Sequence, residues 1–120
     1  MKIKAANTIL YCEKWQETVD FYRNGLKLLI ISSNNWSVEF KLNEMSRLSV
    51  ANEARSSINS NQGKGITISL QVADMDQTRI ELIEVGITPM PIKEKWDSKA
   101  MYIHDSEGNR HKFWMGRLKV

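Results

Sequence analysis

The chain has 120 residues, of which 42% are hydrophobic and 26% are charged. This length allows one hydrophobic core and is too short for two independent domains, so we expect a single domain spanning residues 1–120, and the composition excludes a disordered or fibrous protein. Lysine and arginine exceed aspartate and glutamate by 17 to 14, and the excess is scattered instead of forming a basic block, so we expect no nucleic-acid partner.

Residues 1–7 lack the apolar stretch of a secretory leader, and no apolar run reaches the roughly 18 residues of a membrane-spanning helix. The single cysteine, Cys12, cannot form a disulfide within the chain. We therefore predict a cytoplasmic protein without membrane association, in which Cys12 is a small buried side chain and not a nucleophile.

The first half of the chain predicts a strand, a helix and three further strands. A β-rich run covers residues 3–12. Helical spacing then links Trp15, Val19, Tyr22 and Leu26. Gly25 stands where a helix often ends in a left-handed residue. The three following strands are predicted at residues 28–32, 36–42 and 47–51.

A polar linker, predicted at residues 53–64, separates this half from a second one with the same order of elements. A strand is predicted at residues 66–72, and Asp74 followed by Gln77 has the pattern of a helix cap. Gly86 is expected to end that helix. Three more strands are predicted at residues 87–92, 100–104 and 110–115.

The repeated order predicts an α+β fold of two βαβββ modules, residues 1–52 and 65–120, joined by the linker 53–64. In such a fold the helices cover the outer face of a curved mixed sheet. The inner face then forms a cup, which is a common place for small-molecule sites.

Several motifs in this order resemble the vicinal oxygen chelate superfamily, which includes glyoxalases, bleomycin resistance proteins and extradiol dioxygenases. The matching segments are residues 19–22, Gly25-Leu26, residues 36–40, residues 72–74, Trp96, the turn 105–109 and residues 112–114. Ser106 departs from the proline that is usual in that turn. The resemblance covers nearly the whole chain and implies the cup-forming fold predicted above.

Enzymes of this superfamily hold a divalent metal with side chains from the first and last strands of each module. The resemblance places those positions at Asn7, Ser49, Thr67 and Lys112. These residues are poor metal ligands, because amides and hydroxyls bind weakly and a lysine ammonium repels a cation. We therefore expect no metal and no other cofactor.

Strand alternation assigns one set of side chains to the cup: Asn7, Ile9, Tyr11, Glu39, Lys41, Ser49, Thr67, Ser69, Tyr102, His104, Arg110, Lys112 and Trp114. The predicted ligand-binding residues are Asn7, Tyr11, Ser49, Thr67, Trp96, Tyr102, His104, Arg110, Lys112 and Trp114, with Trp96 added by the resemblance. Alternation points His111 towards the helices. The predicted core comprises Trp15, Val19, Phe40, Leu70, Ile80, Ile83 and Phe113. The alternative is that the sheet is open and that several of these cup residues simply face solvent.

These residues predict a metal-free small-molecule-binding protein of the glyoxalase/bleomycin-resistance type, with an aromatic and partly anionic ligand. The alternative is a lyase, isomerase or dioxygenase of the same superfamily, either metal-dependent or with Glu39 or His104 as general base. An interaction module without a ligand is a third alternative. We also expect a homodimer, because small members of the family usually pair their sheets and apolar sheet edges would otherwise be exposed.

Overall fold

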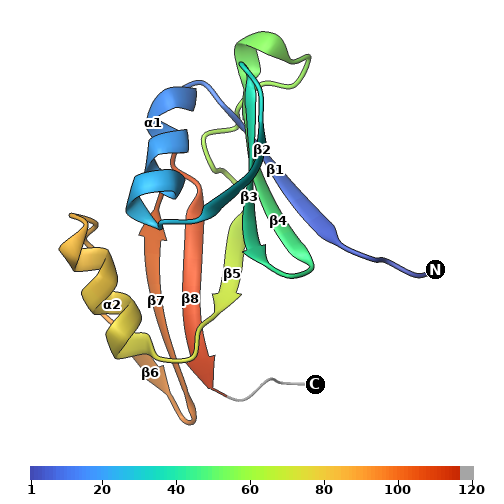
Figure 1. The fold of residues 1–120 in the computed structure, drawn as a ribbon. Helices are drawn as coiled ribbons and strands as arrows, with labels where there is room; N and C mark the ends of the chain where they lie inside the picture. The colour runs from blue at the N-terminus through green and yellow to red at the C-terminus, as the bar shows by residue number, and fades with distance from the viewer. Residues whose placement is uncertain (117–120) are drawn as a thin grey trace. The chain divides into compact units, whose positions relative to one another are not determined.

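A computed structural model describes residues 1–116 and separates the chain into two compact units, Met1–Gln62 and the part from Gly63 onward. Each unit contains a strand, a helical segment and three further strands, and each has one four-stranded mixed sheet (Figure 1). The predicted βαβββ duplication is confirmed. Within residues 1–116, no helix is both long and apolar enough to span a membrane.

The sheet of the first unit has the strand order β1-β4-β3-β2. Its elements are β1 (Ala6–Cys12), α1 (Trp15–Asp20), the π-helical turn η1 (Phe21–Gly25), β2 (Leu29–Ser33), β3 (Ser37–Asn43), β4 (Ser46–Asn52) and the 3₁₀ turn η2 (Glu53–Arg55). Strands β1 and β4 are parallel, whereas the β4–β3 and β3–β2 pairs are antiparallel.

One face of this sheet forms the core of the first unit. Its buried side chains are Leu10, Cys12, Val38, Phe40, Leu48 and Val50. The ring of Tyr22, from η1, packs 5.8 Å from that of Phe40, and the Trp15 indole donates a hydrogen bond of 2.9 Å to the Val50 carbonyl. The predictions that Cys12 and Phe40 are buried are confirmed, while Trp15 and Val19 are partly buried.

The helical segment ends at the predicted residue, but its closing conformation differs from the prediction. Gly25 is the last residue of the π-helical turn, and the left-handed conformation falls on Lys27, with a φ of 56°. The amide of Leu26 donates to the Phe21 carbonyl at 2.9 Å, which is a bond across five residues. Gly25 therefore ends the helical segment as predicted, but the wider turn moves the left-handed residue two positions further, so only the predicted conformation of Gly25 was wrong.

The second unit has the strand order β5-β8-β7-β6. Its elements are β5 (Thr67–Gln71), α2 (Met75–Glu84), β6 (Lys93–Lys95), β7 (Ser98–His104) and β8 (Arg110–Gly116). The Asp74 side chain caps α2 by accepting a hydrogen bond of 3.0 Å from the Gln77 amide, as predicted. Gly86 follows the helix with a φ of 86°, which confirms its predicted role.

Two predictions for the second unit were wrong. The strand expected at residues 87–92 forms instead at Lys93–Lys95, because Pro89 and Pro91 have no amide hydrogen to donate to a sheet. The expected core residues Ile80 and Ile83 are 49% and 53% exposed. Helix α2 buries Met75 and Leu82, which are seven residues apart and share one side of the helix. Ile80 and Ile83 fall outside this buried side.

The turn between β7 and β8 fixes the start of the final strand. The Asp105 carboxylate is buried and accepts hydrogen bonds from the amides of Glu107, at 2.9 Å, and Asn109, at 2.8 Å. Strand β8 then alternates, with His111 and Phe113 buried on the helix-facing side. The predicted register of this strand, including the position of His111, is confirmed.

Candidate functional site

The second face of each sheet carries mostly polar and aromatic side chains. In the first unit, strand pairing aligns Ile9, Ser49, Glu39 and Ser32 in one row across the sheet. A cavity of about 260 Å³ lies against this row. It is lined by Asn7, Ile9, Tyr11, Ser32, Ser33, Asn34, Trp36, Ser37, Glu39, Ser49 and Ala51.

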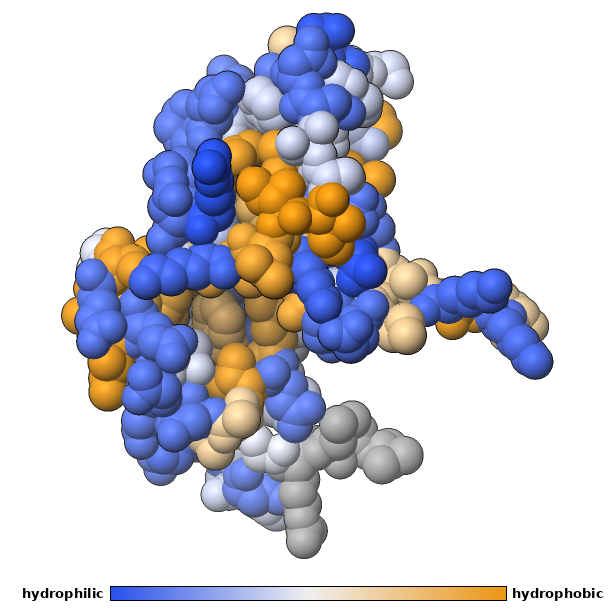
Figure 2. Space-filling model, in the orientation of Figure 1, coloured by the Kyte–Doolittle hydropathy of each residue, from blue (hydrophilic) through white to orange (hydrophobic). Residues whose placement is uncertain are grey.

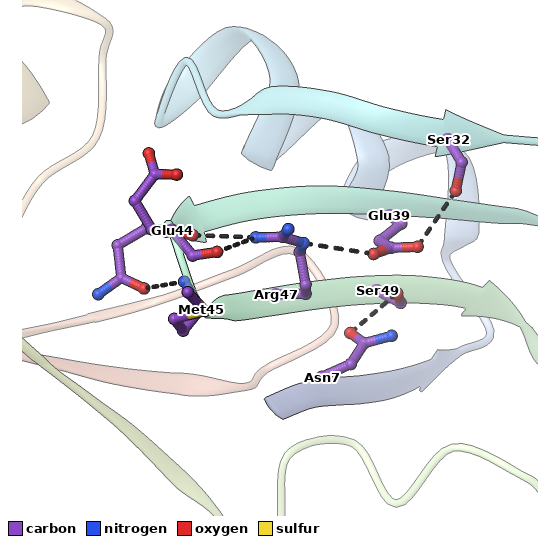
Figure 3. Close-up of polar contacts among 8 residues, drawn as sticks. Asn7, Ser32, Glu39, Glu44, Met45, Arg47 and Ser49 are labelled. Atoms are coloured by element: carbon purple, nitrogen blue, oxygen red, sulfur yellow. Dashed lines mark hydrogen bonds and ion pairs between the residues drawn. The ribbon is translucent and has the colours of Figure 1, made fainter. Parts of the chain in front are cut away.

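Hydrogen bonds order the polar groups of this face (Figure 3). The Ser49 hydroxyl donates to the Asn7 side-chain oxygen at 3.0 Å, and the Ser32 hydroxyl donates to Glu39 Oε1 at 3.2 Å. Arg47 Nε lies 3.6 Å from Glu39 Oε2. The sequence predictions for Asn7, Tyr11, Ser49 and Glu39 therefore concern residues that share one cavity wall.

Two residues of this face were missed or misplaced by the sequence analysis. Arg47 was not considered, although it is two residues from Ser49 and alternation along β4 would have put it on the same face. Alternation along the strand predicted at residues 36–42 would put Trp36 on the same face as Val38, but Trp36 precedes β3 and lines the cavity. The Asn34 side chain accepts hydrogen bonds from the amides of Trp36 and Ser37, so alternation does not extend back to Trp36.

The corresponding face of the second unit is cationic and aromatic. The Arg110 guanidinium donates a hydrogen bond of 2.8 Å from Nε to the Thr67 hydroxyl and lies 4.9 Å from the centre of the Tyr102 ring. Lys112 of β8 is paired directly with Tyr102 of β7. Trp114 is the next residue of β8 on this same face.

A shallow hollow of about 420 Å³ lies at one end of this face. Its lining consists of Gly63, Gly65, Ile66, Thr67, His104, Gly108 and Arg110. Gly63 makes the hollow possible: its φ is 77°, and a Cβ atom there would be 2.1 Å from the Gly108 carbonyl oxygen. The two loops can lie this close only because residue 63 has no side chain.

The structure does not bring Trp96 to this group. Trp96 forms the tip of the β6–β7 hairpin with Asp97, is fully exposed, and has a φ of 51°. Tyr102 lies four residues further along β7 than Ser98, which closes the hairpin. The assignment of Trp96 to the ligand site thus remains a prediction from the resemblance alone.

The positions that would hold a divalent metal do not fit one. Asn7 and Ser49 are hydrogen-bonded to each other, and the Thr67 hydroxyl accepts from a guanidinium. Lys112 adds a second cation beside Arg110, and two positive charges repel a metal ion. Among residues 1–116, no group of three or more His, Cys, Asp or Glu side chains could hold a metal ion.

Two βαβββ units with these sheet orders define the glyoxalase/bleomycin resistance/dioxygenase fold, as the resemblance to the vicinal oxygen chelate superfamily implied. Solved structures of this class match almost the whole chain. One is a glyoxalase/bleomycin resistance protein/dioxygenase from Nocardioides, with a TM-score of 0.79 and 13% identity over 100% of this chain and 87% of the other.

Two further matches illustrate the range of functions on this fold. Lactoylglutathione lyase from Agrobacterium tumefaciens has a TM-score of 0.76 and 21% identity, covering 97% of this chain and 96% of the other. The bleomycin-binding protein from Streptomyces verticillus, solved with copper(II)-bleomycin, has a TM-score of 0.74 and 16% identity, covering 98% and 99%. No family model and no curated protein matches the chain. At these identities the similarity establishes the fold and not the ligand.

Proposed function

We propose that this chain is a metal-free small-molecule-binding protein and that the open sheet face of its second unit binds an aromatic ligand with an anionic group. The observation that carries the proposal is the arrangement of Arg110, which is hydrogen-bonded to Thr67 and stacked on Tyr102. The similarity in fold to a bleomycin-binding protein supports binding as the activity.

The charge and the shape of this face support the same ligand class. Arg110 and Lys112 supply two positive charges, and a guanidinium fixed in place loses little freedom when it binds a carboxylate, sulfate or phosphate. Tyr102 and Trp114 supply flat apolar surface for a ring. Neutral aliphatic compounds satisfy neither feature and should bind poorly.

A cytoplasmic location and a homodimer are also part of this proposal. The location rests on the composition of the chain and on its single, buried cysteine. The dimer rests on the exposed apolar edge of the first-unit sheet, which is considered with its own test in the Discussion.

The proposal predicts that 2-naphthoate binds more tightly than its neutral counterpart 2-naphthylmethanol. Replacing Lys112 by Ala should weaken 2-naphthoate binding by about 1 to 3 kcal/mol, because a charge-assisted contact is lost. Isothermal titration calorimetry measures this difference. Equal affinity of the two compounds for the wild-type protein would contradict the proposal.

Two control variants separate the site from general effects of charge and of folding. Lys99→Ala removes one positive charge from β7 on the opposite face of the same sheet, and should leave 2-naphthoate affinity nearly unchanged. His111→Ala should lower thermal stability and also leave affinity nearly unchanged, because that side chain is fully buried on the helix-facing side. Loss of affinity in His111→Ala without loss in Lys112→Ala would place the ligand on the helix-facing side of the sheet and contradict the proposal.

A further inference from the structure

We infer that the ligand of the open sheet face of the second unit carries two anionic groups, one at each end of its ring system, and that Lys93 of β6 binds the second of them. This inference rests on the function proposed above and narrows the ligand class. The sequence analysis did not assign Lys93 to the site, because the strand expected in this region covered residues 87–92 and the observed strand begins at Lys93.

Strand pairing extends the ligand-binding face to the edge strand β6. Trp114 of β8 pairs with Ala100 of β7, and Ala100 pairs with Lys93 of β6. Side chains of residues that are paired in this way project from the same face of a sheet. Lys93 therefore lies in one row with Trp114, on the face that also carries Lys112.

The middle position of this row leaves room for a ring. Ala100 has only a methyl group, and it separates the Trp114 indole from the Lys93 side chain. Tyr102 is the next residue of β7 on this face. An aromatic ring over Ala100 has an indole on one side, a phenol along the strand and the Lys93 ammonium on the other side.

The separation of Lys112 and Lys93 suits anionic groups at opposite ends of a two-ring aromatic. The two residues are two strands apart, so their backbones are separated by roughly 10 Å across the sheet and roughly 7 Å along it. The flexible lysine side chains can bring the two ammonium groups closer than this. Carboxylates at opposite ends of a naphthalene can then contact both cations, whereas adjacent carboxylates reach only one.

The charged side chains of this face all have the same sign. The lysines and the arginine that alternation places on it are Lys93, Lys95, Arg110 and Lys112. None of the side chains that the described strands β5, β6, β7 and β8 place there is acidic. Glu94 is on the opposite face, where it pairs with Lys99 at 3.7 Å. Within residues 1–116, Lys93 makes no ion pair, so its charge is available to a ligand.

The direct probe is 2,6-naphthalenedicarboxylate, with 2-naphthoate and 2,3-naphthalenedicarboxylate as matched compounds. The 2,3-isomer carries the same charge at one end of the ring system, so it separates the effect of spacing from that of charge. In isothermal titration calorimetry at low ionic strength, the 2,6-isomer should bind at least about threefold more tightly than either of the other two compounds.

Lys93→Ala should weaken binding of the 2,6-isomer by about threefold to fivefold, because an exposed ion pair contributes modestly. Its affinity for 2-naphthoate should stay nearly unchanged. Lys99→Ala is the matched control, since it removes a lysine of the neighbouring strand from the opposite face, and it should change neither affinity. Lys93 is exposed on a short edge strand, so its substitution should leave the fold intact.

The outcomes distinguish this inference from the proposed function. Equal affinities for the 2,6- and 2,3-isomers, or equal losses in Lys93→Ala and Lys99→Ala, would overturn the inference. In either case, 2-naphthoate binding that is weakened by Lys112→Ala would leave the proposed function standing. Absence of binding by all three compounds would contradict both.

Discussion

At the scale of single residues, His111 is an imidazole held in the core of the second unit. It is fully buried and stacks on Phe113, with ring centres 6.5 Å apart. Burial lowers the pKa of His111 to about 4, from an ordinary value of 6.5. The negative charge of Asp105 opposes this shift, and the charge of His104 adds to it.

The lowered pKa predicts that the protein loses stability in mild acid. A histidine whose pKa is lower in the folded state stabilises the fold fully above pH 6.5 and progressively less as the pH falls towards 4. Over this window the free energy of unfolding should fall by about 3 kcal/mol through His111, at 1.4 kcal/mol per pKa unit. Urea unfolding of the wild-type protein and of His111→Gln at several pH values measures it.

The informative quantity is the difference between the two pH profiles, because carboxylates also change charge at the acid end. His111→Gln should be less stable at pH 8 and should lose less stability than the wild-type protein between pH 6.5 and 4. If stability fell equally with pH in both proteins, the prediction of a lowered His111 pKa would be contradicted.

The residue pattern predicted the orientation of His111 because β8 alternates without interruption from its first residue. Arg47 lies on an equally regular strand and could have been found by the same rule. Trp36 could not, because its position depends on the Asn34 side chain, which bonds the backbone ahead of β3. A local hydrogen bond from a side chain to the backbone cannot be recognised from the alternation of apolar and polar residues.

At the scale of elements, the order of strands and helices was predictable, whereas the left-handed residue after η1 and the position of β6 were not. Helix α2 has a capping residue and a closing glycine that the sequence displays. The left-handed residue follows η1 at Lys27 because of a π-type hydrogen bond that has no sequence signature, and β6 was displaced by two prolines. Neither error moved a predicted ligand residue off its strand.

The exposed apolar edge of strand β2 is the feature that most directly favours dimerisation. It is an edge strand, and Leu29, Ile30 and Ile31 are 69%, 41% and 45% exposed. Hydrophobic atoms gather on the surface of this part of the first unit (Figure 2). An apolar, unpaired edge favours pairing with a second copy of the chain.

We expect a homodimer, with a light-scattering mass near twice the 13.9 kDa of one chain at micromolar concentration. Ile30→Lys should shift this mass towards the monomer, because a charge at the edge opposes strand pairing. Ile80→Lys is the control, since Ile80 is similarly exposed on α2 at 49%. A monomeric wild-type protein, or equal effects of both substitutions, would contradict pairing through β2.

At the scale of the whole molecule, the fold is shared with proteins of different activities, so it does not determine the ligand. The proposed site lies in the open sheet faces, where the charged and aromatic side chains of this chain gather. One unit presents Glu39 in an aromatic cavity, and the other presents Arg110 and Lys112 beside Tyr102. The positions at which the resemblance would place a metal carry amide, hydroxyl and ammonium groups.

The central claim is that the second-unit face binds an aromatic anion through its own cations and without a metal. Calorimetric titration of 2-naphthoate into the protein, before and after treatment with EDTA, tests it most directly. The affinity should be the same in both samples and should not rise when zinc, nickel, manganese or iron(II) is added. Binding that disappears with EDTA and returns with one of these ions would contradict the claim.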